Sequence, residues 1–532
     1  VAQGNYLLKI YCLGHEEFTQ AVELTKDTML EVEVKESPYK LKEVTVTGKR
    51  ETIEVNEGNI RINIKDSPLA AIPNSIDLVA ALPAITVSPN REEISIVGRG
   101  EPLIYLDNQR ITVEQFYGIP VNNIKSIEII DNPSAKYEAD GRALILVKTD
   151  KKKLEGTRIT LSEFASWKTF FNNYMTVNTQ FKKKKFEFKA NAGFNALQPR
   201  ERVESGFELE PGGSQLDARN RVTADGNKPE FVLSGGLFYG INDNDYVSLD
   251  VNSYFFDATS DIYGNGAISD QDRTMITRTQ NDSDDSRNFV NGSFNFNKKL
   301  NQSNLFFGTQ YTRFQRDLGA YVEVSSDDNE LAPLEQRNQS LSANALSGRL
   351  DYELPLGNQS KLELGLNVTT IETQTTQKIR NLVVDEVITD TDYNYEEQIY
   401  ATYGQVSGKL SEKIRYSTGV RLESYLAEGG FAGQELSVER EQLNLFPKAK
   451  VDFKLDSLYN LQLNFARSIK RPNFTELTQV SVFVAPFLVF DNNLNLAPSF
   501  TNELSMRLFR QDKSLTLTYF ERENPIYSAT FF

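Results

Sequence analysis

Apolar and polar residues alternate with a period of two along most of the chain from about residue 154 to residue 532. In the segment LELGLNV, residues 362–368, leucine and valine occupy every second position, with Glu363, Gly365 and Asn367 between them. Successive side chains of a strand point to opposite faces, so such a segment predicts a strand with one apolar and one polar face. The pattern recurs at 186–194, 346–354, 451–455, 459–465, 504–508 and 515–519. The chain is therefore predicted to be mainly β.

The connections between these segments predict how the strands are arranged. Short turns are predicted at 297–302, 356–359 and 411–413, and long loops at 207–227, 263–287, 318–340 and 379–396. Short connections at one end and long ones at the other are typical of transmembrane antiparallel β-barrels, whose polar face lines a wet interior. A large soluble β-protein would show the same alternation, and an aromatic content of 11% suits either class.

The length of the alternating region sets the expected number of strands. About 380 residues at roughly 24 residues per strand give roughly 16 strands. A barrel wide enough to enclose a folded domain needs about 22 strands. We therefore expect C-terminal strands to be missing from the chain, and its start in mid-strand suggests missing N-terminal residues as well.

Composition argues against several functional classes. The net charge of −15 argues against a nucleic-acid partner, because phosphate binding needs a basic surface. The single cysteine, Cys12, and the single histidine, His15, leave no disulfide, cysteine metal site or histidine-pair zinc motif. No nucleophile or paired-carboxylate motif stands out, so no enzyme, catalytic residue, metal or cofactor is predicted. No apolar run of about 18 residues predicts a transmembrane helix.

A compact α+β module is predicted before the alternating region, at 77–151. Apolar residues at helical spacing, from Ile76 to Leu82, stop before Pro83, as in a short helix. Short strands are predicted at 94–96, 103–106, 124–130 and 143–147, with turns between them. Residues 1–36 alternate as three further strands, at 6–12, 18–24 and 30–34, in which Cys12 and His15 are expected to be structural.

The module resembles the plug domain of TonB-dependent outer-membrane receptors of the Bacteroidetes type. Four segments carry the resemblance: LPAITV (82–87), SIVGRG (95–100), LIYLDNQRI (103–111) and IKSIEIIDNPSAKYEADG (124–141). FARSIKRPNFTEL (465–477) and NNLNLAPSFTNELSMRL (492–508) resemble the late barrel of the same family. The chain departs from the family at 142–147, where RALILV stands in place of a glycine-rich strand.

The resemblance implies four parts: the end of a carboxypeptidase-regulatory-like β-sandwich (1–36), a linker (37–50), a plug (51–152) and an outer-membrane barrel (153–532). It also implies motif residues. In the plug these are Gly98, Arg99, Gly100, Asp107, Asp131, Asn132, Pro133, Tyr137 and Gly141, and in the barrel they are Arg467, Arg471, Pro472, Leu496 and Pro498. We expect Arg99 to pair with charges of the barrel wall rather than to contact a ligand.

The linker segment LKEVTVTG resembles the segment that precedes the plug in this family. Its candidates for strand addition to TonB are Glu43, Val44, Thr45, Val46 and Thr47. The alternative is that these residues form the first strand of the plug itself.

The implied function is import of a ligand across the outer membrane of a Gram-negative bacterium, driven by the TonB–ExbB–ExbD complex. Expected partners are outer-membrane lipid and lipopolysaccharide, and a surface lipoprotein or envelope-complex subunits. A second hypothesis is a receptor-like barrel that acts as a non-transporting subunit of an assembly or secretion complex, which the lost glycines near Arg142 favour. A third, a soluble adhesin-like β-protein, explains the alternation but not the module.

Overall fold

The computed structural model describes residues 2–10, 16–35, 52–56, 59–72, 74–88, 94–97, 101–106, 109–111, 113, 116, 119, 121–130, 133, 135–137, 139, 143–149, 155–167, 169–209, 216–242, 244–269, 273–327, 329–357, 359–456, 458–472, 482–485, 488–490, 493, 496–510 and 513–527. The chain divides into two compact units, Val1–Glu51 and Thr52–Phe532, and each is described by itself.

The first unit contains one antiparallel hairpin. Strand β1 (Gly4–Ile10) pairs with β2 (Phe18–Leu24), from Gly4 opposite Leu24 to Ile10 opposite Phe18. Two of the three strands predicted for this region are confirmed. The third, at 30–34, is wrong: the residues alternate in character, but no strand among the described residues pairs with them to form a ladder. Cys12 and His15 lie outside the described residues.

The second unit begins with an α+β module, defined here as residues 53–149. Its six-stranded sheet has the order β3-β4-β9-β10-β7-β8, in which β10 runs parallel to β7 and antiparallel to β9. The strands are β3 (Ile53–Asn56), β4 (Asn59–Asn63), β7 (Leu103–Leu106), β8 (Gln109–Ile111), β9 (Ile124–Ile130) and β10 (Leu144–Thr149). A small hairpin, β5 (Ile85–Val87) with β6 (Ile94–Ile96), and two 3-10 turns, η1 (Pro68–Ala71) and η2 (Val121–Asn123), complete it.

The predicted helix of the module is confirmed as α1 (Ser75–Ala80). Asn74 caps its start, because its side-chain oxygen accepts a hydrogen bond from the backbone N–H of Asp77 at 2.8 Å. Leu78 and Val79 of this helix are fully buried in a core that also contains Ile94 of β6, Phe116 and apolar residues of the six-stranded sheet. The module thus has a hydrophobic core of its own, as an independently folding domain requires.

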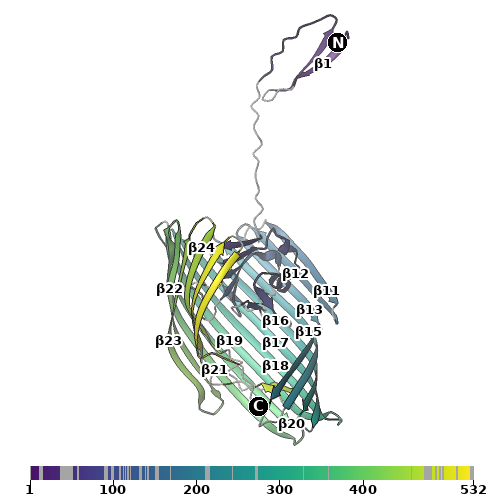
Figure 1. Ribbon diagram of the computed structural model, residues 1–532, viewed down its shortest axis with the longest axis vertical. Helices are drawn as coiled ribbons and strands as arrows, with labels where there is room; N and C mark the ends of the chain where they lie inside the picture. The colour runs from purple at the N-terminus through teal and green to yellow at the C-terminus, as the bar shows by residue number, and fades with distance from the viewer. Residues whose placement is uncertain are drawn as a thin grey trace. The chain divides into compact units, whose positions relative to one another are not determined.

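The rest of the second unit is a 16-stranded antiparallel sheet, here called the barrel sheet. Its path is β11-β12-β13-β15-β16-β17-β18-β19-β20-β21-β22-β23-β24-β27-β28, and β14 pairs with β15 beside that path. Figure 1 shows these long strands side by side and tilted in a common direction. Within the described part of the chain, the end strands β11 and β28 do not pair with each other.

The barrel sheet, which is also called the wall, consists of sixteen strands. They are β11 (Gly156–Trp167), β12 (Phe171–Lys183), β13 (Phe186–Leu197), β14 (Arg200–Leu209), β15 (Leu216–Gly240), β16 (Tyr246–Ser269), β17 (Thr274–Leu300), β18 (Ser303–Ser326), β19 (Ala332–Leu356), β20 (Ser360–Asn381), β21 (Glu386–Ser411), β22 (Ile414–Phe431), β23 (Leu436–Lys454), β24 (Tyr459–Lys470), β27 (Ser499–Arg510) and β28 (Lys513–Glu523). A separate two-strand hairpin consists of β25 (Val482–Ala485) and β26 (Leu488–Phe490).

The long loops predicted from the sequence are wrong. Residues 207–227, 263–287, 318–340 and 379–396 lie mainly in strands, and the connections at those ends span only a few residues. Residues 277–287 are polar on both faces, so they lack the apolar alternation that identifies a strand in sequence. Backbone pairing and cross-strand charges hold them extended: Asp285 of β17, for example, accepts two hydrogen bonds of 2.9 Å from Arg316 of β18.

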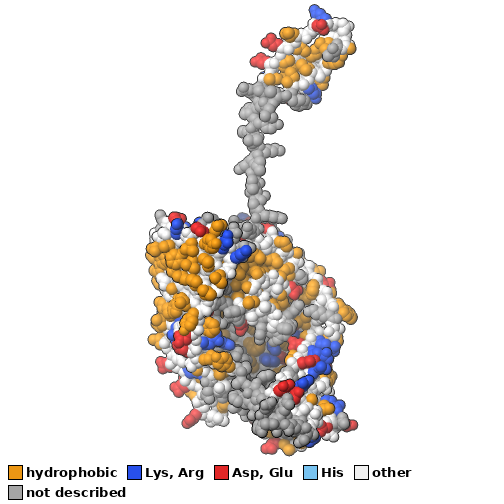
Figure 2. Space-filling view, in the orientation of Figure 1, with side chains coloured by type: hydrophobic (Ala, Val, Ile, Leu, Met, Phe, Trp, Pro, Cys, Tyr) orange, Lys and Arg blue, Asp and Glu red, His pale blue; other side chains and the backbone are white. Residues whose placement is uncertain are grey.

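The two faces of the barrel sheet differ as the alternation predicts. The outward face exposes large apolar side chains such as Ile159, Val177, Leu233, Leu366 and Leu504. Figure 2 shows hydrophobic side chains gathered on the outside of the sheet, most densely over β22 to β24. The opposite face carries buried polar residues and faces the module. No helix among the described residues combines the length and the apolar character needed to cross a bilayer.

Candidate functional site

The structure describes only some of the motif residues predicted from the sequence. Pro133 and Tyr137 of the module and Arg467, Arg471, Pro472, Leu496 and Pro498 of the barrel lie among the described residues. The other predicted plug residues, Gly98, Arg99, Gly100, Asp107, Asp131, Asn132 and Gly141, lie outside them, as do Glu43, Val44, Thr45, Val46 and Thr47. The expected pairing of Arg99 with the wall therefore stays a prediction.

The module contacts the polar face of the barrel sheet through the segment that follows β9, here called the seat (residues 133–139). Lys448 of β23 donates a hydrogen bond to the Pro133 carbonyl at 3.1 Å. Gln405 of β21 accepts one from the backbone N–H of Ala135 at 2.8 Å. The N–H of Ile469 in β24 donates to the Ala139 carbonyl at 3.1 Å. Three strands of the wall thus hold three backbone groups of the seat.

An ion pair adds a fourth attachment. The Lys136 ammonium lies 3.5 Å from the Asp351 carboxylate of β19. Asp351 also accepts hydrogen bonds from Arg349, 2.7 Å from its Nε, and from the Tyr403 hydroxyl. Burial lowers the pKa of Lys136, and the nearby Arg349 lowers it further, whereas Asp351 opposes both. The carboxylate thus keeps a desolvated ammonium paired at this contact.

Tyr137 lies on the module side of the seat. Its ring packs edge-on against Tyr105 of β7, with centroids 4.8 Å apart. Burial raises the pKa of its hydroxyl to about 12, so it stays a neutral group at physiological pH. The motif residue thus fastens the seat to the module's own sheet.

Beside the seat, the wall carries a buried charge cluster. Glu423 of β22 is 0% exposed and accepts hydrogen bonds of 2.5 Å from Arg421 and from the predicted motif residue Arg471. Arg471 also lies over the Tyr425 ring, 4.9 Å from its centroid. The Glu423 carboxylate lies between the guanidinium groups of Arg421 and Arg471. It compensates part of their positive charge at a buried position.

The other described barrel motif residues are Arg467, Pro472, Leu496 and Pro498. The Arg467 guanidinium lies 5.1 Å from the centroid of the Phe500 ring, which stacks on Phe446, and Phe446 packs against Ala139 of the seat. The Leu496 carbonyl accepts a hydrogen bond from Arg440 at 2.5 Å. Pro472 and Pro498 are buried. The structure therefore brings the late-barrel motif, at Ile469, into contact with the seat, at Ala139, although 330 positions separate the two residues.

Sequence reasoning missed the wall side chains that hold the seat, namely Asp351, Gln405 and Lys448, and also Glu423 of the buried charge cluster. Each is a polar residue in an alternating strand and looks like any other member of the water-facing row. The one available signal is chemical: lysine, glutamate and arginine in the middle of a strand must be paired when the strand is buried.

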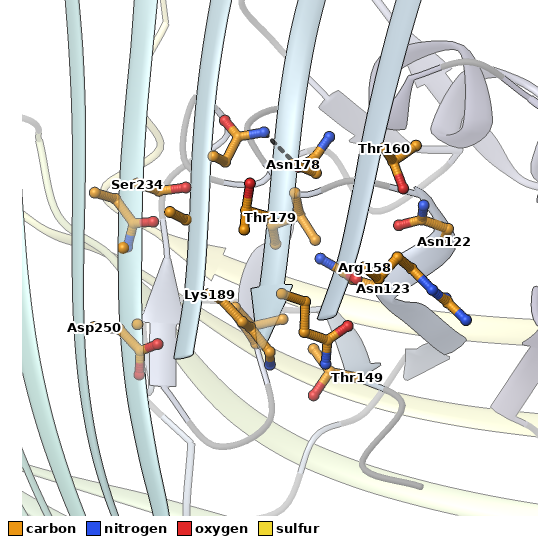
Figure 3. A pocket seen from close by; sticks show the side chains of 18 residues that line it. Asn122, Asn123, Thr149, Arg158, Thr160, Asn178, Thr179, Lys189, Ser234 and Asp250 are labelled. Atoms are coloured by element: carbon orange, nitrogen blue, oxygen red, sulfur yellow. Dashed lines mark hydrogen bonds between the residues drawn. The ribbon is translucent and has the colours of Figure 1, made fainter. Parts of the chain in front are cut away.

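Two adjoining cavities lie on the other side of the module, against β11, β12, β13, β15 and β16. Figure 3 shows side chains of one cavity: Asn122, Asn123 and Thr149 come from the module, and Arg158, Thr160, Asn178, Lys189, Ser234 and Asp250 come from the wall. Within the described residues, no three of histidine, cysteine, aspartate and glutamate are grouped so that they could hold a metal ion.

Comparisons with known proteins agree with this architecture. Residues 295–531 match the family described as "Outer membrane protein beta-barrel family". No curated protein sequence matches the chain. Among solved structures, the fold is similar to the copper transporter OprC, with a TM-score of 0.57 and 11% identity over 87% of this chain and 70% of that one.

Two further structures are similar at the same level. One is the Serratia marcescens hemophore receptor HasR in complex with its hemophore HasA and heme (TM-score 0.53, 11% identity, 88% of this chain and 73% of that one). The other is the RagAB peptide importer in its open-open state (TM-score 0.51, 10% identity, 89% and 67%). At such low identity the likeness concerns the fold alone: the chain has the fold of outer-membrane β-barrel receptors.

Proposed function

We propose that this protein is a receptor of the Gram-negative outer membrane that imports a ligand through its barrel. In this proposal the module is the plug, and the TonB–ExbB–ExbD complex supplies the energy by pulling on residues 43–47. The ligand would bind at the outer end of the barrel, and release of the seat from the wall would open a path. The source would be a bacterium of the Bacteroidetes type, as the resemblance of the module implies.

The observation that carries the proposal is the seat. A separately folded module with its own core contacts the polar face of the barrel sheet through Pro133, Ala135, Lys136 and Ala139. A permanently open pore would have no use for such an obstruction. Similar folds in a copper transporter and a peptide importer support transport, as an argument by analogy of fold.

The contacts are suited to reversible release. Hydrogen bonds and one ion pair hold the seat, and each is worth about 0.5–3 kcal/mol. A mechanical pull can break such contacts one after another without unfolding the barrel sheet, because they are few compared with the hydrogen bonds between its strands. The outer membrane itself carries no useful ion gradient, so an external source of energy is expected.

The test compares cells that carry the full-length protein, a variant lacking residues 43–47, and no protein, each with and without TonB. Solutes remaining in the spent growth medium are measured by mass spectrometry. We expect at least one solute to be depleted only when the intact protein and TonB are both present. If the five deficient strains deplete the same solutes as the complete one, import is excluded.

A second candidate is a non-transporting subunit of an envelope complex that assembles or secretes other proteins. The observation that favours it is β10, whose residues Leu144 to Val147 are fully or almost fully buried in the module. A strand packed in this way resists being drawn out of the module. Under this candidate, affinity purification would return other envelope proteins in fixed stoichiometry, and the solute comparison would show no difference.

A further inference from the structure

A groove of about 400 Å³ lies on the outward face of strands β12, β13, β15 and β16. Two cross-strand rows line it, each with one residue from each strand: Val177, Ala192, Leu233 and Ser253 in the first, and Thr179, Ala190, Gly235 and Val251 in the second. Small side chains in both rows make the surface concave here. One water-sized group occupies about 30 Å³ in a liquid, so the groove has room for a chain of several methylene groups.

Large side chains border the groove at both ends. Toward the β12–β13 turn the bordering row is Phe181, Phe188, Leu237 and Leu249, and on the far side it is Met175, Phe194, Phe231 and Phe255. Most of these side chains are exposed on the outward face, and the Phe194 and Phe231 rings lie 4.8 Å apart between centroids. An apolar chain in the groove would therefore touch protein on several sides, and it would gain more dispersion contacts than on a flat part of the wall.

Lysines gather where the strands that line the groove begin and end. Residues 182–185, here called the lysine turn, end β12 and connect it to β13. The Lys185 ammonium donates a hydrogen bond to the Ile241 carbonyl. The Glu155 carboxylate accepts one from the backbone N–H of Lys184 at 2.9 Å and offsets part of the charge. Four lysines beside this carboxylate leave an excess of positive charge, in a chain whose net charge is −15.

The distance from the lysine turn to the groove fits a lipid molecule. Lys183 and Thr179 lie on the same face of β12, four positions apart, which is about 13 Å at 3.3 Å per residue. The hydrocarbon core of a bilayer is about 30 Å thick, so one leaflet accounts for about 15 Å. A lipid whose phosphate lies beside Lys183 would therefore reach the groove with an acyl chain.

The lysine turn also lies at a defined end of the barrel sheet. Lys184 and Lys185 alone join β12 to β13, whereas residues 471–498 connect β24 to β27 at the opposite end. Outer-membrane barrels have short turns on the periplasmic side and longer connections on the outer side. The lysine turn therefore belongs to the periplasmic side, where the leaflet consists of glycerophospholipids.

We propose that the groove and the lysine turn together bind one anionic glycerophospholipid of the phosphatidylglycerol class. An acyl chain lies between the two rows of large side chains, and the phosphate lies beside Lys183, Lys184 and Lys185. The lysines select a negative headgroup, because basic residues at a membrane surface attract anionic lipid. The proposal goes beyond import: it requires the barrel sheet to lie in a membrane but not to transport a solute.

The test is native mass spectrometry of the purified full-length protein in a non-ionic detergent. Phosphatidylglycerol and phosphatidylcholine with the same acyl chains are added in equal amounts. We expect one retained phosphatidylglycerol, at least five-fold more abundant than retained phosphatidylcholine. Glycerol 3-phosphate in excess, which offers the phosphate without the chains, should leave the lipid in place.

Lysine variants test the headgroup contact. A triple variant of the lysine turn should retain the two lipids equally, and it consists of Lys183→Gln, Lys184→Gln and Lys185→Gln. The matched control removes three exposed lysines at or near other turns of the same end, namely Lys409→Gln, Lys413→Gln and Lys454→Gln. The control should keep the preference for phosphatidylglycerol, because these lysines do not adjoin the groove.

Alanine variants test the groove. Ala192→Phe fills its floor and should lower the retained phosphatidylglycerol at least three-fold. Ala449→Phe is the matched control, because Ala449 lies on the same face of β23 as the exposed Leu445 and outside the groove. It should leave retention unchanged. Ala190→Phe provides a second block of the groove if Ala192→Phe does not fold.

The inference is overturned if the unchanged protein retains both lipids equally, if glycerol 3-phosphate displaces the lipid, or if either variant behaves like its control. The result is independent of the solute comparison in cells. A retained lipid without TonB-dependent depletion would contradict import alone, and depletion without a retained lipid would contradict this site alone.

Discussion

Lys448 of the barrel wall donates a hydrogen bond to the carbonyl oxygen of Pro133 in the module, over 3.1 Å and in a position that solvent barely reaches. A lysine ammonium has three hydrogens and a strongly hydrated charge, so its burial requires a compensating environment. Here a backbone carbonyl of the module supplies part of it. Displacement of the seat would therefore leave the buried Lys448 ammonium without one of the groups that compensate its charge.

Lys448→Met should loosen the seat. The substitution leaves the Pro133 carbonyl without its donor, and a hydrogen bond to a charged group contributes about 1.5–3 kcal/mol. Amide hydrogen exchange at residues 135–139 should therefore become at least ten-fold faster. Lys450→Met is the matched control, because Lys450 lies two residues along the same strand and pairs loosely with Asp452 at 3.9 Å. Equal exchange rates in the two variants would contradict the assignment of Lys448 to the seat.

Glu423→Gln should strongly destabilise the barrel. The substitution removes the one carboxylate between Arg421 and Arg471, and breaking a buried ion pair on one side costs roughly 3–5 kcal/mol. The free energy of unfolding in detergent micelles, measured by guanidinium titration, should fall by that amount. Glu353→Gln affects an exposed pair, 3.7 Å from Lys361, and should change it by less than about 1 kcal/mol. A small effect at Glu423 would show that water reaches the cluster.

Gly365→Ala should disturb the seat from a distance. The added Cβ would overlap the Tyr403 ring, whose hydroxyl donates to Asp351, the partner of Lys136. Such overpacking costs about 1–3 kcal/mol, and displacement of Tyr403 should also speed exchange at 135–137. Gly292→Ala, where the added Cβ meets no atom within 4 Å, should leave stability and exchange unchanged. If the two alanine variants change stability and exchange equally, the Tyr403 ring does not depend on the space that Gly365 leaves free.

The β15–β16 turn should make stability depend on pH in the acid range. The Asp245 carboxylate accepts hydrogen bonds from the Lys299 backbone N–H at 2.7 Å and from Lys298 and Asn242. These hydrogen bonds, the backbone one first, lower the pKa of Asp245 from 3.8 to about 2. Because the pKa in the folded state is the lower one, the stabilisation is complete above about pH 4 and is lost as the pH falls toward 2.

Asp245→Asn provides the measurement for this pH dependence. The difference in free energy of unfolding between the unchanged protein and the variant should be constant from pH 7 to about pH 4, and should shrink between pH 4 and pH 2. A difference that stays constant down to pH 2 would show that the carboxylate is not held by the turn. The same direction is expected at the β23–β24 turn, where the N–H groups of Leu458 and Tyr459 lower the pKa of Asp456.

Local patterns in the sequence were sufficient for most secondary structure. Alternation at 362–368 predicts both the strand and which side chains point away from the polar interior. Successive side chains of a strand point to opposite faces of the sheet, so the position of a residue in the strand decides its face. Helix α1 follows from its apolar spacing and from Pro83. The strands around Asp282 and Asp285 could not be predicted this way, because they are polar on both faces and owe their extension to neighbours rather than to their own residues.

The seat likewise combines a segment that the sequence singles out with partner residues that it does not. Its segment, from Pro133 to Tyr137, stands out in the sequence as part of a long motif that resembles a known family. Its partners Asp351, Gln405 and Lys448 do not, since nothing local separates them from the other polar residues of their strands. The sequence by itself determined the strands, their two faces and the core of the module. Only the tertiary structure decided which polar residues meet across more than 200 positions, because burial and pairing of charge depend on what lies opposite in space.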